Sequence, residues 1–531
     1  MKSGAKNKSN LFTIGSSFPW YPVLFALFAP LALLAQNLGQ VEISNGICAI
    51  IITVILAFLL LFISRLVLND WVRAGAVSAV LTVLMVTYGH VYAAIKNYEI
   101  SGIIIGRHRY LVLIWLVLAV LGLWWSVKKS FLVPTLSSSM NLAGVVLLIY
   151  PFFQVISYAF SSQGQQNQLI ETHAVQTSQY DITLPDGQMP PDVYYIILDA
   201  YGRSDTLLQT LDYDNSAFLD GLRQLGFYVA DCAQSNYAKT DLSLSSSLNL
   251  DYVTALGSSF SPESTDRLPL WTLIKNNEVK VIFENLSYTT IAFDTGYDFT
   301  EVESSDVYYS APAKGLNGFE NLYLQTTLAA VMDDFGLLRN LQLTPEDRKR
   351  ELILFKLAEL QKIPATLPSP KFVFAHLVIP HQPFVFGPDG EPFVIYERTF
   401  KGQTYYPTRD YALGYHNQAI YISQQILDVI KVILEESPQP PVIMLQGDHG
   451  ISHFGKTDRV TILNAYYFPN RKPNLYPNIT PVNSFRLLFN LYFHADFDLL
   501  EDVSYYSDYP YAYQFEIIPN TCQPALDNKI E

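Results

Sequence analysis

The stretch "VIMLQGDHGISHFG", Val442–Gly455, runs from four apolar residues into an adjacent aspartate and histidine. The apolar run is typical of a short buried strand. Asp448 and His449 follow it, and Gly447 and Gly450 flank them, so the backbone is free to turn sharply and approach its neighbours closely. A carboxylate at the end of a buried strand is costly unless it is paired or bound to a metal ion. The stretch therefore predicts a polar site at this strand end.

Two further apolar runs lead to residues of the same kind. "DVYYIILDA", Asp192–Ala200, ends beside Asp199, and "KFVFAHLVI", Lys371–Ile379, is followed by Pro380-His381. Such runs are typical of buried parallel strands. In an open parallel sheet, ligands bind beyond the carboxyl ends of the strands. We therefore expect these polar side chains and those after residue 446 to converge at one edge of a mostly parallel sheet.

Helical patterns alternate with these runs over residues 191–531. They lie at Asn215–Phe227, which ends near a glycine, at Thr344–Ile363, which has a proline at its first turn, and at Thr480–Phe493. The alternation predicts an α/β/α layer domain over residues 191–531. The polar segment Ser161–Pro190 is rich in Gln and Ser, and we interpret residues 161–190 as a linker.

The first 160 residues differ in character from the rest. The whole chain has 531 residues, of which 50% are hydrophobic and only 15% charged, which is too apolar for a purely soluble protein. Each of five apolar stretches is close to the roughly 20 residues that a helix needs to cross a bilayer. Five in series disfavour buried helices of a soluble core. We expect about five transmembrane helices, at Phe18–Leu38, Cys48–Leu68, Val72–Ile95, Tyr110–Val127 and Met140–Phe160.

The charge distribution suggests an orientation. Residues 1–160 carry a net charge of +7 and the remainder −21, so nucleic-acid binding by the acidic part is not expected. With a cytoplasmic N-terminus, seven Lys or Arg lie on the inner side and three on the outer side, in accord with the positive-inside rule. We predict an integral protein of the plasma (inner) membrane with an extracytoplasmic domain. There, Cys232 and Cys522 could pair or remain free thiols.

The converging residues predict a metal centre. Asp199, Asp448 and His449 offer two carboxylates and one imidazole, a donor set that suits Zn²⁺ or Mn²⁺. One divalent ion is expected, and a second is left open. Thr240 in "KTDLSLSSSL" precedes a stretch with helical spacing, so its hydroxyl would lie at a helix N-terminus, where backbone N–H groups can hold an anion. Alternatively, Thr240 serves only as a helix cap.

These motifs resemble the alkaline phosphatase superfamily in its sulfatase-like branch. "IILDAYGRSD", "KTDLSLSSSL", "PHQP" and "QGDHG", together with the apolar N-terminal part, are similar to membrane-anchored lipoteichoic acid synthases and phosphoethanolamine transferases. The resemblance implies a nucleophile, Thr240, that shares a metal ion with Asp199, Asp448 and His449, and a substrate-contacting His381. The C/S-x-P-x-R segment of sulfate ester hydrolases is absent, because Cys232 is followed by "AQSN".

Three other residues have two interpretations. Arg203 could clamp a phosphate or form a surface salt bridge. His453 follows the Asp-His pair by only a few residues and is a candidate for substrate binding. His376 lies within a predicted strand and is expected to be packed or hydrogen-bonded rather than a ligand.

The resemblance implies a metal-dependent transferase. It would move a phospho-headgroup of the phosphoglycerol or phosphoethanolamine type from a membrane lipid to a glycan or lipid acceptor through a phospho-threonine intermediate. The alternatives are a hydrolase, meaning a phosphodiesterase, phosphatase or sulfuric ester hydrolase, and a non-catalytic lipid-binding sensor. The oligomeric state is left open.

Overall fold

The computed structural model describes residues 18–96, 98–100, 103–104, 106–128, 133–177, 180, 182–184, 187, 189–257, 259–312, 315–395, 398–400, 403–405, 407–471, 474–509 and 511–522. The chain forms two compact units. The first, which we call the helical unit, comprises Met1–Ser161, Leu316–Pro345 and Thr399–Gln403. The second, the α/β unit, comprises Ser162–Gly315, Glu346–Arg398 and Thr404–Glu531.

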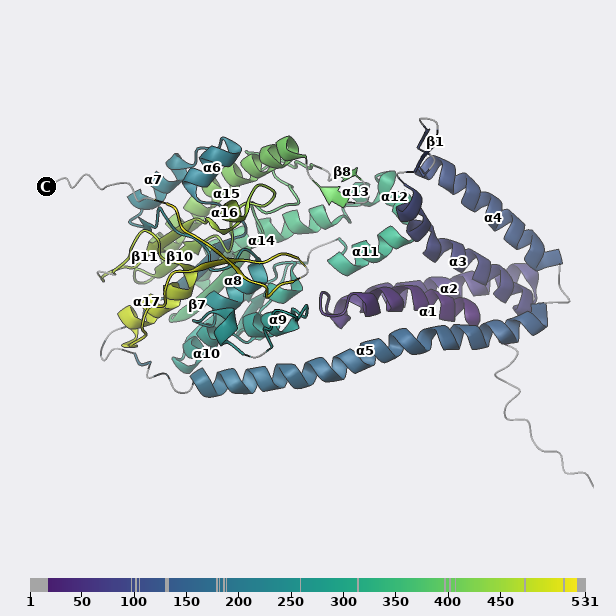
Figure 1. Cartoon of the computed structure of the whole chain (residues 1–531), viewed down its shortest axis with the longest axis horizontal. Coiled ribbons are helices and arrows are strands. Elements are labelled where there is room, and N and C mark those ends of the chain that lie inside the picture. Colours follow the sequence, from purple (N-terminus) through teal and green to yellow (C-terminus); the bar gives the residue numbers. More distant parts are fainter. Residues whose placement is uncertain are drawn as a thin grey trace, which may run out of the picture. The chain divides into compact units, whose positions relative to one another are not determined.

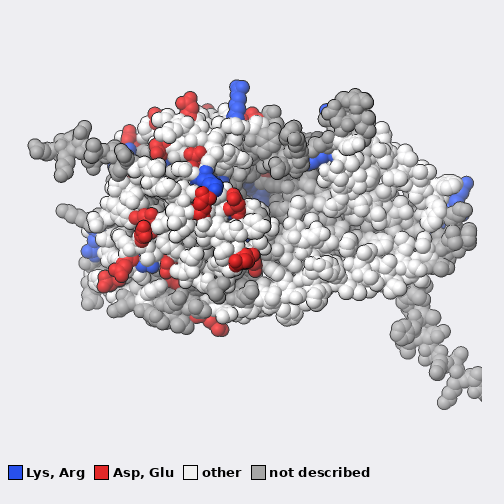
Figure 2. All heavy atoms as spheres, viewed as in Figure 1, with Lys and Arg blue, Asp and Glu red and all other residues white. Residues whose placement is uncertain are grey.

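Five apolar helices form the first part of the helical unit, as predicted (Figure 1). They are α1 (Tyr21–Gln36), α2 (Ile47–Leu68), α3 (Trp71–Ile95), α4 (His108–Lys128) and α5 (Val133–Thr177). The last four are long and apolar enough to cross a membrane, whereas α1 has only 16 residues. On the face seen in Figure 2, charged side chains are sparse over the helical unit and gather on the α/β unit.

The helix α5 continues beyond the predicted end of the fifth span. The first part of the predicted linker, Ser161–Thr177, is helical. Apart from Gly164, this stretch lacks helix-breaking residues, and its Gln, Leu, Glu and Ala residues favour helix. The polar composition of Ser161–Thr177 therefore indicated exposure to solvent. It did not indicate irregular structure.

The helical unit also contains a segment from the middle of the sequence. Residues Leu316–Pro345 carry α11 (Gly318–Thr326), α12 (Ala330–Asp334) and α13 (Leu337–Asn340). The domain prediction treated residues 191–531 as one continuous domain and did not separate this segment.

A seven-stranded sheet forms the centre of the α/β unit, with strand order β4-β11-β10-β3-β7-β5-β6. The strands β10, β3, β7, β5 and β6 are parallel, and β11 is antiparallel to both β10 and β4, so the predicted mostly parallel sheet is confirmed. The strands are β3 (Val193–Leu198), β4 (Tyr228–Val229), β5 (Thr289–Phe293), β6 (Val307–Tyr309), β7 (Lys371–Leu377), β10 (Val442–Gln446) and β11 (Asn464–Tyr467).

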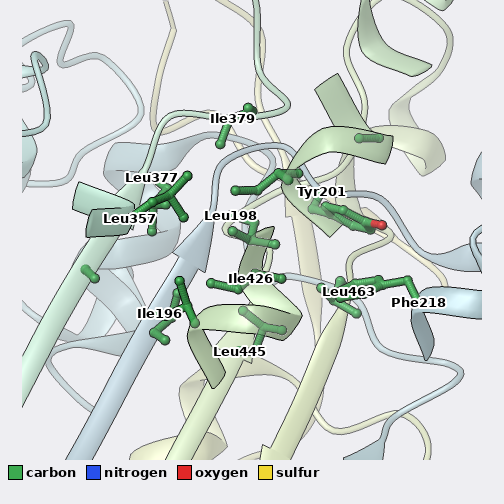
Figure 3. Packing of buried hydrophobic residues seen from close by; sticks show 14 of the residues in the cluster. Ile196, Leu198, Tyr201, Phe218, Leu357, Leu377, Ile379, Ile426, Leu445 and Leu463 are labelled. Atoms are coloured by element: carbon green, nitrogen blue, oxygen red, sulfur yellow. The ribbon is translucent and has the colours of Figure 1, made fainter. Parts of the chain in front are cut away.

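Both faces of the sheet are covered by helices. In β3, Ile196 and Leu198 face a core formed with α7 (Ser216–Gln224), α14 (Pro345–Thr366) and α15 (Thr408–Glu436), part of which is shown in Figure 3. The alternate residues of β3 face a second core, formed with α8 (Thr240–Ser247), α10 (Glu278–Asn285) and α17 (Ser484–Tyr492). The central strands β3, β7 and β10 are buried on both faces, which explains their predominantly apolar sequences.

The three predicted helices of this unit correspond to α7, α14 and α17, the last preceded by a 3₁₀ turn. The remaining helices and strands of the two units are short. They are α6 (Ser204–Leu211), α9 (Leu268–Lys275), α16 (Lys456–Val460), β1 (Glu99–Ile100), β2 (Ile103–Ile104), β8 (Arg398–Phe400), β9 (Gln403–Tyr405), β12 (Ser504–Tyr506) and β13 (Glu516–Ile518).

Candidate metal and catalytic site

The register of three strands brings the predicted polar residues to one edge. In the β3–β7 pair, Leu198 lies opposite Leu377, and in the β10–β3 pair Gln446 lies opposite Ile197. The carboxyl ends of β10, β3 and β7 therefore coincide. The residues that follow these ends are Asp199, His381, Asp448 and His449, and His376 lies in the last part of β7.

These side chains approach one another closely. His449 Nε2 lies 3.6 Å from Asp199 Oδ1 and 3.7 Å from Asp448 Oδ2, and His376 Nε2 lies 3.4 Å from Asp199 Oδ2. Two overlapping sets each place their ligand atoms within 4.8 Å of one another: Asp199 with His381 and His449, and Asp199 with His376 and Asp448. Asp199 belongs to both sets and is the centre of the cluster.

Several atoms of the cluster are buried without a hydrogen-bond partner. They are both carboxylate oxygens of Asp199, Oδ2 of Asp448 and Nε2 of His376. All three residues are at most 1% exposed. Leaving a buried carboxylate unpaired is costly, and a bound cation removes that cost. Carboxylate oxygens with imidazole nitrogens suit Zn²⁺ or Mn²⁺, so the residues present fit a divalent metal ion.

The protonation states also suit metal binding. Burial raises the pKa of Asp199, but the nearby imidazoles of His381, His376 and His449 outweigh burial and hold this pKa below its ordinary value. Burial lowers the pKa of His381 and of His449 to about 4. Both imidazoles are therefore neutral at neutral pH, the form that ligates metals. Burial and the Asp199 charge raise the pKa of Asp448 to about 6.

The backbone around the cluster is tightly packed. A Cβ atom on Gly447 would lie 2.5 Å from the carbonyl oxygen of Tyr201, and one on Gly450 would lie 2.1 Å from that of Asp458. Both positions thus require glycine because of close approach. Ala200 has a φ of 64°, and its N–H donates to Asp448 Oδ1 at 3.0 Å. This bond joins the turn after β3 to the turn after β10.

One face of α15 holds the loops that carry the site residues. The Tyr415 hydroxyl accepts from Gly202 N–H at 3.0 Å and donates to the Ala200 carbonyl at 2.9 Å. Gln418 Nε2 donates to the carbonyl oxygens of Pro380 and His381 at 3.0 and 3.1 Å, and its Oε1 accepts from Val385 N–H at 2.8 Å. The helix therefore positions the loops after β3 and β7 relative to one another.

Thr240 is the first residue of α8 and is 9% exposed. Its side chain interacts with the Asp448 carboxyl and lowers the pKa of that group, which burial otherwise raises. The structure thus places Thr240 beside the cluster. Neighbouring serines have other partners: Ser245 Oγ donates to the Asp241 carbonyl and Ser246 Oγ to the Asp251 carbonyl. These contacts favour Thr240 over the two serines as the reacting hydroxyl.

Two predicted substrate residues have local partners. Arg203 forms a bidentate salt bridge with Asp205, at 2.7 and 2.9 Å, and donates to the Ala233 carbonyl at 3.1 Å. Arg203 is only 7% exposed, so this salt bridge is not the surface contact that was one of its two interpretations. His453 is exposed, has a φ of 77°, and lies edge-on to the ring of Tyr411. His381 is half-buried, and the Tyr297 hydroxyl lies 3.4 Å from its Nδ1.

From the sequence, we expect His376 to be packed or hydrogen-bonded, and we do not single out Arg459. His376 has a hydrogen-bonding neighbour, Thr300 Oγ1, at 3.3 Å from its Nδ1, but its other ring nitrogen points to Asp199. Its position one residue before the end of a strand was the available signal. The positive charge of Arg459 contributes, after burial, to the lowered pKa of His449, and its Nε donates to the Ala238 carbonyl at 2.8 Å. No local motif marks this arginine.

A buried cation lies next to the threonine. Lys239 Nζ is buried and makes no hydrogen bond. Burial and the neighbouring Arg267 lower the pKa of Lys239 to about 8. The region in front of α8 is therefore electropositive, which suits an anionic substrate group.

No family model matches the chain, and no curated protein matches it. Solved structures similar to it include the C-terminal periplasmic domain of EcEptC from Escherichia coli, with 12% identity, a TM-score of 0.40, and coverage of 65% of this chain and 96% of that one. Another is the integral membrane lipooligosaccharide phosphoethanolamine transferase A (EptA) from Neisseria meningitidis, with 12% identity, a TM-score of 0.37, and coverage of 86% and 89%.

A putative sulfatase from Bacteroides thetaiotaomicron is also similar, with 12% identity, a TM-score of 0.37, and coverage of 57% of this chain and 71% of that one. These are the kinds of protein that the sequence motifs resemble. Likenesses this distant assign no activity to this chain.

Proposed function

We propose that this protein is a membrane-anchored, metal-dependent transferase that moves a phospho-headgroup from a lipid to a glycan or lipid acceptor. The observation that carries the proposal is the group of buried, unpartnered acidic and imidazole atoms around Asp199, with the Thr240 hydroxyl beside it. Uncompensated carboxylates of this kind are typical of metal sites. A hydroxyl nucleophile next to such a site is suited to phosphoryl transfer.

Asp199 would hold a divalent ion, with His381 and His449 in one set of ligand atoms and with His376 and Asp448 in the other. The predicted ligands Asp448 and His449 thus belong to different sets. When bound, the ion would supply positive charge that lowers the pKa of a hydroxyl and neutralises phosphate oxygens. Since the two sets share only Asp199, a second ion is compatible with the arrangement.

The chemistry proceeds in two displacements at phosphorus. The Thr240 oxygen forms a bond to the phosphorus of the lipid while the bond to the lipid alcohol breaks, and that alcohol leaves with a proton. A hydroxyl of the acceptor then attacks the phospho-threonine, loses its proton, and releases Thr240. The first turn of α8 offers backbone N–H groups to the phosphate oxygens, and Lys239 and Arg459 add positive charge nearby.

We further propose an inner-membrane location with a cytoplasmic N-terminus and the α/β unit outside. The apolar helices and the excess of Lys and Arg on the inner side support this orientation. The disulfide between Cys232 and Cys522 supports it independently, because disulfides persist in oxidising compartments outside the cytoplasm.

The test combines metal analysis with trapping of the intermediate. The purified full-length protein is incubated with radiolabelled phosphatidylglycerol or phosphatidylethanolamine, with and without a glycan acceptor. We expect bound Zn or Mn and label on the Thr240 peptide. We expect turnover to fall at least 10³-fold in Thr240→Ala and Asp448→Asn, and metal content to fall in Asp448→Asn.

The matched control is Ser246→Ala, which removes a hydroxyl of the same helix whose partner is the Asp251 carbonyl. Labelled Thr240 with free headgroup but no modified acceptor would identify a hydrolase instead. Absence of both metal and label would contradict catalysis and favour a lipid-binding role.

A further inference from the structure

The segment Leu316–Pro345 lies between two parts of the α/β unit in sequence but packs within the helical unit. Phe319 and Tyr323 of α11 are buried in a cluster with Leu34 of α1 and Ala49 of α2. The segment thus contacts the C-terminal end of α1 and the N-terminal part of α2. These ends lie on one side of the helical unit.

The contact with α3 is made by backbone atoms. The N–H of Leu328 donates to the carbonyl oxygen of Met85 in α3 at 2.8 Å. A Cβ atom on Gly89 would lie 2.0 Å from the carbonyl oxygen of Gln325 and 2.4 Å from the carbonyl carbon of Thr326. The segment therefore rests directly on α3 at Gly89, and no larger residue fits there without displacing it.

Tyr323, Asn317 and Glu320 of the segment have hydrogen-bond partners inside the unit. The hydroxyls of Tyr323 and Thr53 are hydrogen-bonded at 3.1 Å, and Asn317 Nδ2 donates to the Asn45 carbonyl at 3.4 Å. Asn317 and Glu320 also form a capping box at the start of α11. Backbone and polar groups that lie among lipid must be hydrogen-bonded within the protein in this way.

The depth of the contact follows from helix geometry. Thr53 lies six residues after the start of α2 and Gly89 six residues before the end of α3, which places both about 9 Å from the helix ends. Helices of 22 and 25 residues exceed a ~30 Å hydrocarbon core by only about 3 to 8 Å in total. For α2 and α3 centred on the hydrocarbon layer, the contacts with Thr53 and Gly89 lie within it.

The exposed side chains of the segment include several large apolar ones, beside the polar Arg339, Asn340 and Gln342. Phe335 is 79% exposed, Leu341 56% and Met332 44%. Leu322, Leu328 and Leu337 are also exposed, at 37% to 41%. In water, a patch of this kind is unfavourable, whereas acyl chains cover it at no cost.

We propose that Leu316–Pro345 is a membrane-inserted element in the leaflet that contains the C-terminal ends of α1 and α3, with Phe335 and Leu341 in contact with lipid. Both ends of the segment continue into the α/β unit, at Gly315 and Glu346. The element therefore attaches that unit to the bilayer at a point additional to α5. Its partner is the lipid surface itself, and the proposal does not depend on the catalytic activity.

The test measures the depth of single labels. In a Cys48→Ala background, the disulfide keeps Cys232 and Cys522 unreactive, so Phe335→Cys can be labelled alone with an NBD fluorophore. Leu208→Cys, at an exposed position of α6 in the α/β unit, is the control. The full chain is reconstituted in nanodiscs of phosphatidylcholine, with or without lipid spin-labelled on its acyl chain.

We expect the spin-labelled lipid to quench the label at position 335 at least threefold more than the label at position 208. We expect iodide in water to quench the label at position 208 more than the label at position 335. Equal access of iodide to both labels, with no quenching by lipid at position 335, would overturn the proposal.

Gly89→Ala tests the contact between the segment Leu316–Pro345 and α3. Its control is Gly164→Ala, since a Cβ atom on Gly164 meets nothing within 4 Å. We expect Gly89→Ala to reduce lipid quenching at position 335 while far-ultraviolet circular dichroism retains the helix content. Unchanged quenching in both variants would show that α3 does not hold the segment, and would refute its placement against Gly89.

Discussion

At the residue scale, the site depends on groups whose burial is unfavourable unless they have partners. Asp199 is fully buried, and neither of its carboxylate oxygens has a hydrogen bond, although three imidazoles surround it. A bound cation would pair with these oxygens. Gly447 and Gly450 also matter for this site, because backbone carbonyl oxygens lie where a Cβ atom at either position would be.

Gly450→Ala tests this close approach. Its Cβ atom would meet the carbonyl oxygens of Asp458 and Thr461 at 2.1 and 2.4 Å, so the turn that carries His449 must shift. We expect a loss of about 1–3 kcal/mol in unfolding free energy and weaker metal binding. Calorimetry and metal titration measure these effects. Gly221→Ala, whose nearest neighbour would be a flexible Leu427 methyl at 3.0 Å, is the control and should retain its metal affinity.

Glu301 offers a pH test on a carboxyl that is not a proposed metal ligand. Burial, followed by the Asp294 carboxylate, raises the pKa of Glu301 from 4.5 to about 8. The folded protein therefore holds a proton that the unfolded chain releases, and this contribution to stability is present below pH 4.5 and is lost as the pH rises toward 8. Glu301→Gln should make the melting temperature less dependent on pH between 5 and 8, whereas exposed Glu303→Gln should not. Identical pH profiles for the two variants would contradict the assigned pKa.

At the element scale, α15 organises the site from outside it. Its residues Tyr411, Tyr415 and Gln418 recur every three or four positions and so share one face of the helix. They bond to the backbone of Ser452, to that of Ala200 and Gly202, and to the loop after β7. Three loops that carry site residues thus depend on one helix.

Gln418→Ala removes three buried hydrogen bonds to the loop of His381 but no metal ligand. We expect kcat to fall about 10-fold, because an unpaired buried backbone group costs ~1–3 kcal/mol and the loop relaxes. Metal content should remain at the wild-type value, as measured by elemental analysis. Gln424→Ala, at an exposed position of the same helix, should have wild-type kcat; a similar loss in both variants would indicate a general effect on α15.

At the scale of the whole molecule, one covalent bond joins distant parts of the α/β unit. The disulfide connects residues 290 positions apart, and Cys232 follows β4 while Cys522 lies near the end of the described chain. It closes a very long loop and so restricts the unfolded chain.

Cys522→Ser should lower the unfolding free energy by roughly 2–4 kcal/mol, which calorimetry of the α/β transition measures. Reducing agent should lower the melting temperature of the wild-type protein and leave that of the variant unchanged. Cys48→Ser is the control, because Cys48 is the free cysteine of the described residues. A wild-type melting temperature that does not respond to reductant would count against the bond.

The sequence by itself determined the elements with strong local patterns. Five apolar helices, three buried strands and the polar residues after Leu198, Ile379 and Gln446 were all readable from runs of consecutive residues. Their meeting at one sheet edge followed from a general rule of parallel sheets, since the carboxyl ends of neighbouring strands coincide. Such features depend on interactions between residues close together in the chain.

Only the tertiary structure decided the remaining features. His376 looked like a packed strand residue until the β3–β7 register placed it against Asp199, and both interpretations of Arg203 and of the two cysteines were open until their partners were known. Leu316–Pro345 carries no local sign of the membrane helices that it contacts. The physical reason is the same in each case: the partner lies tens to hundreds of residues away, and only the folded chain brings the two together.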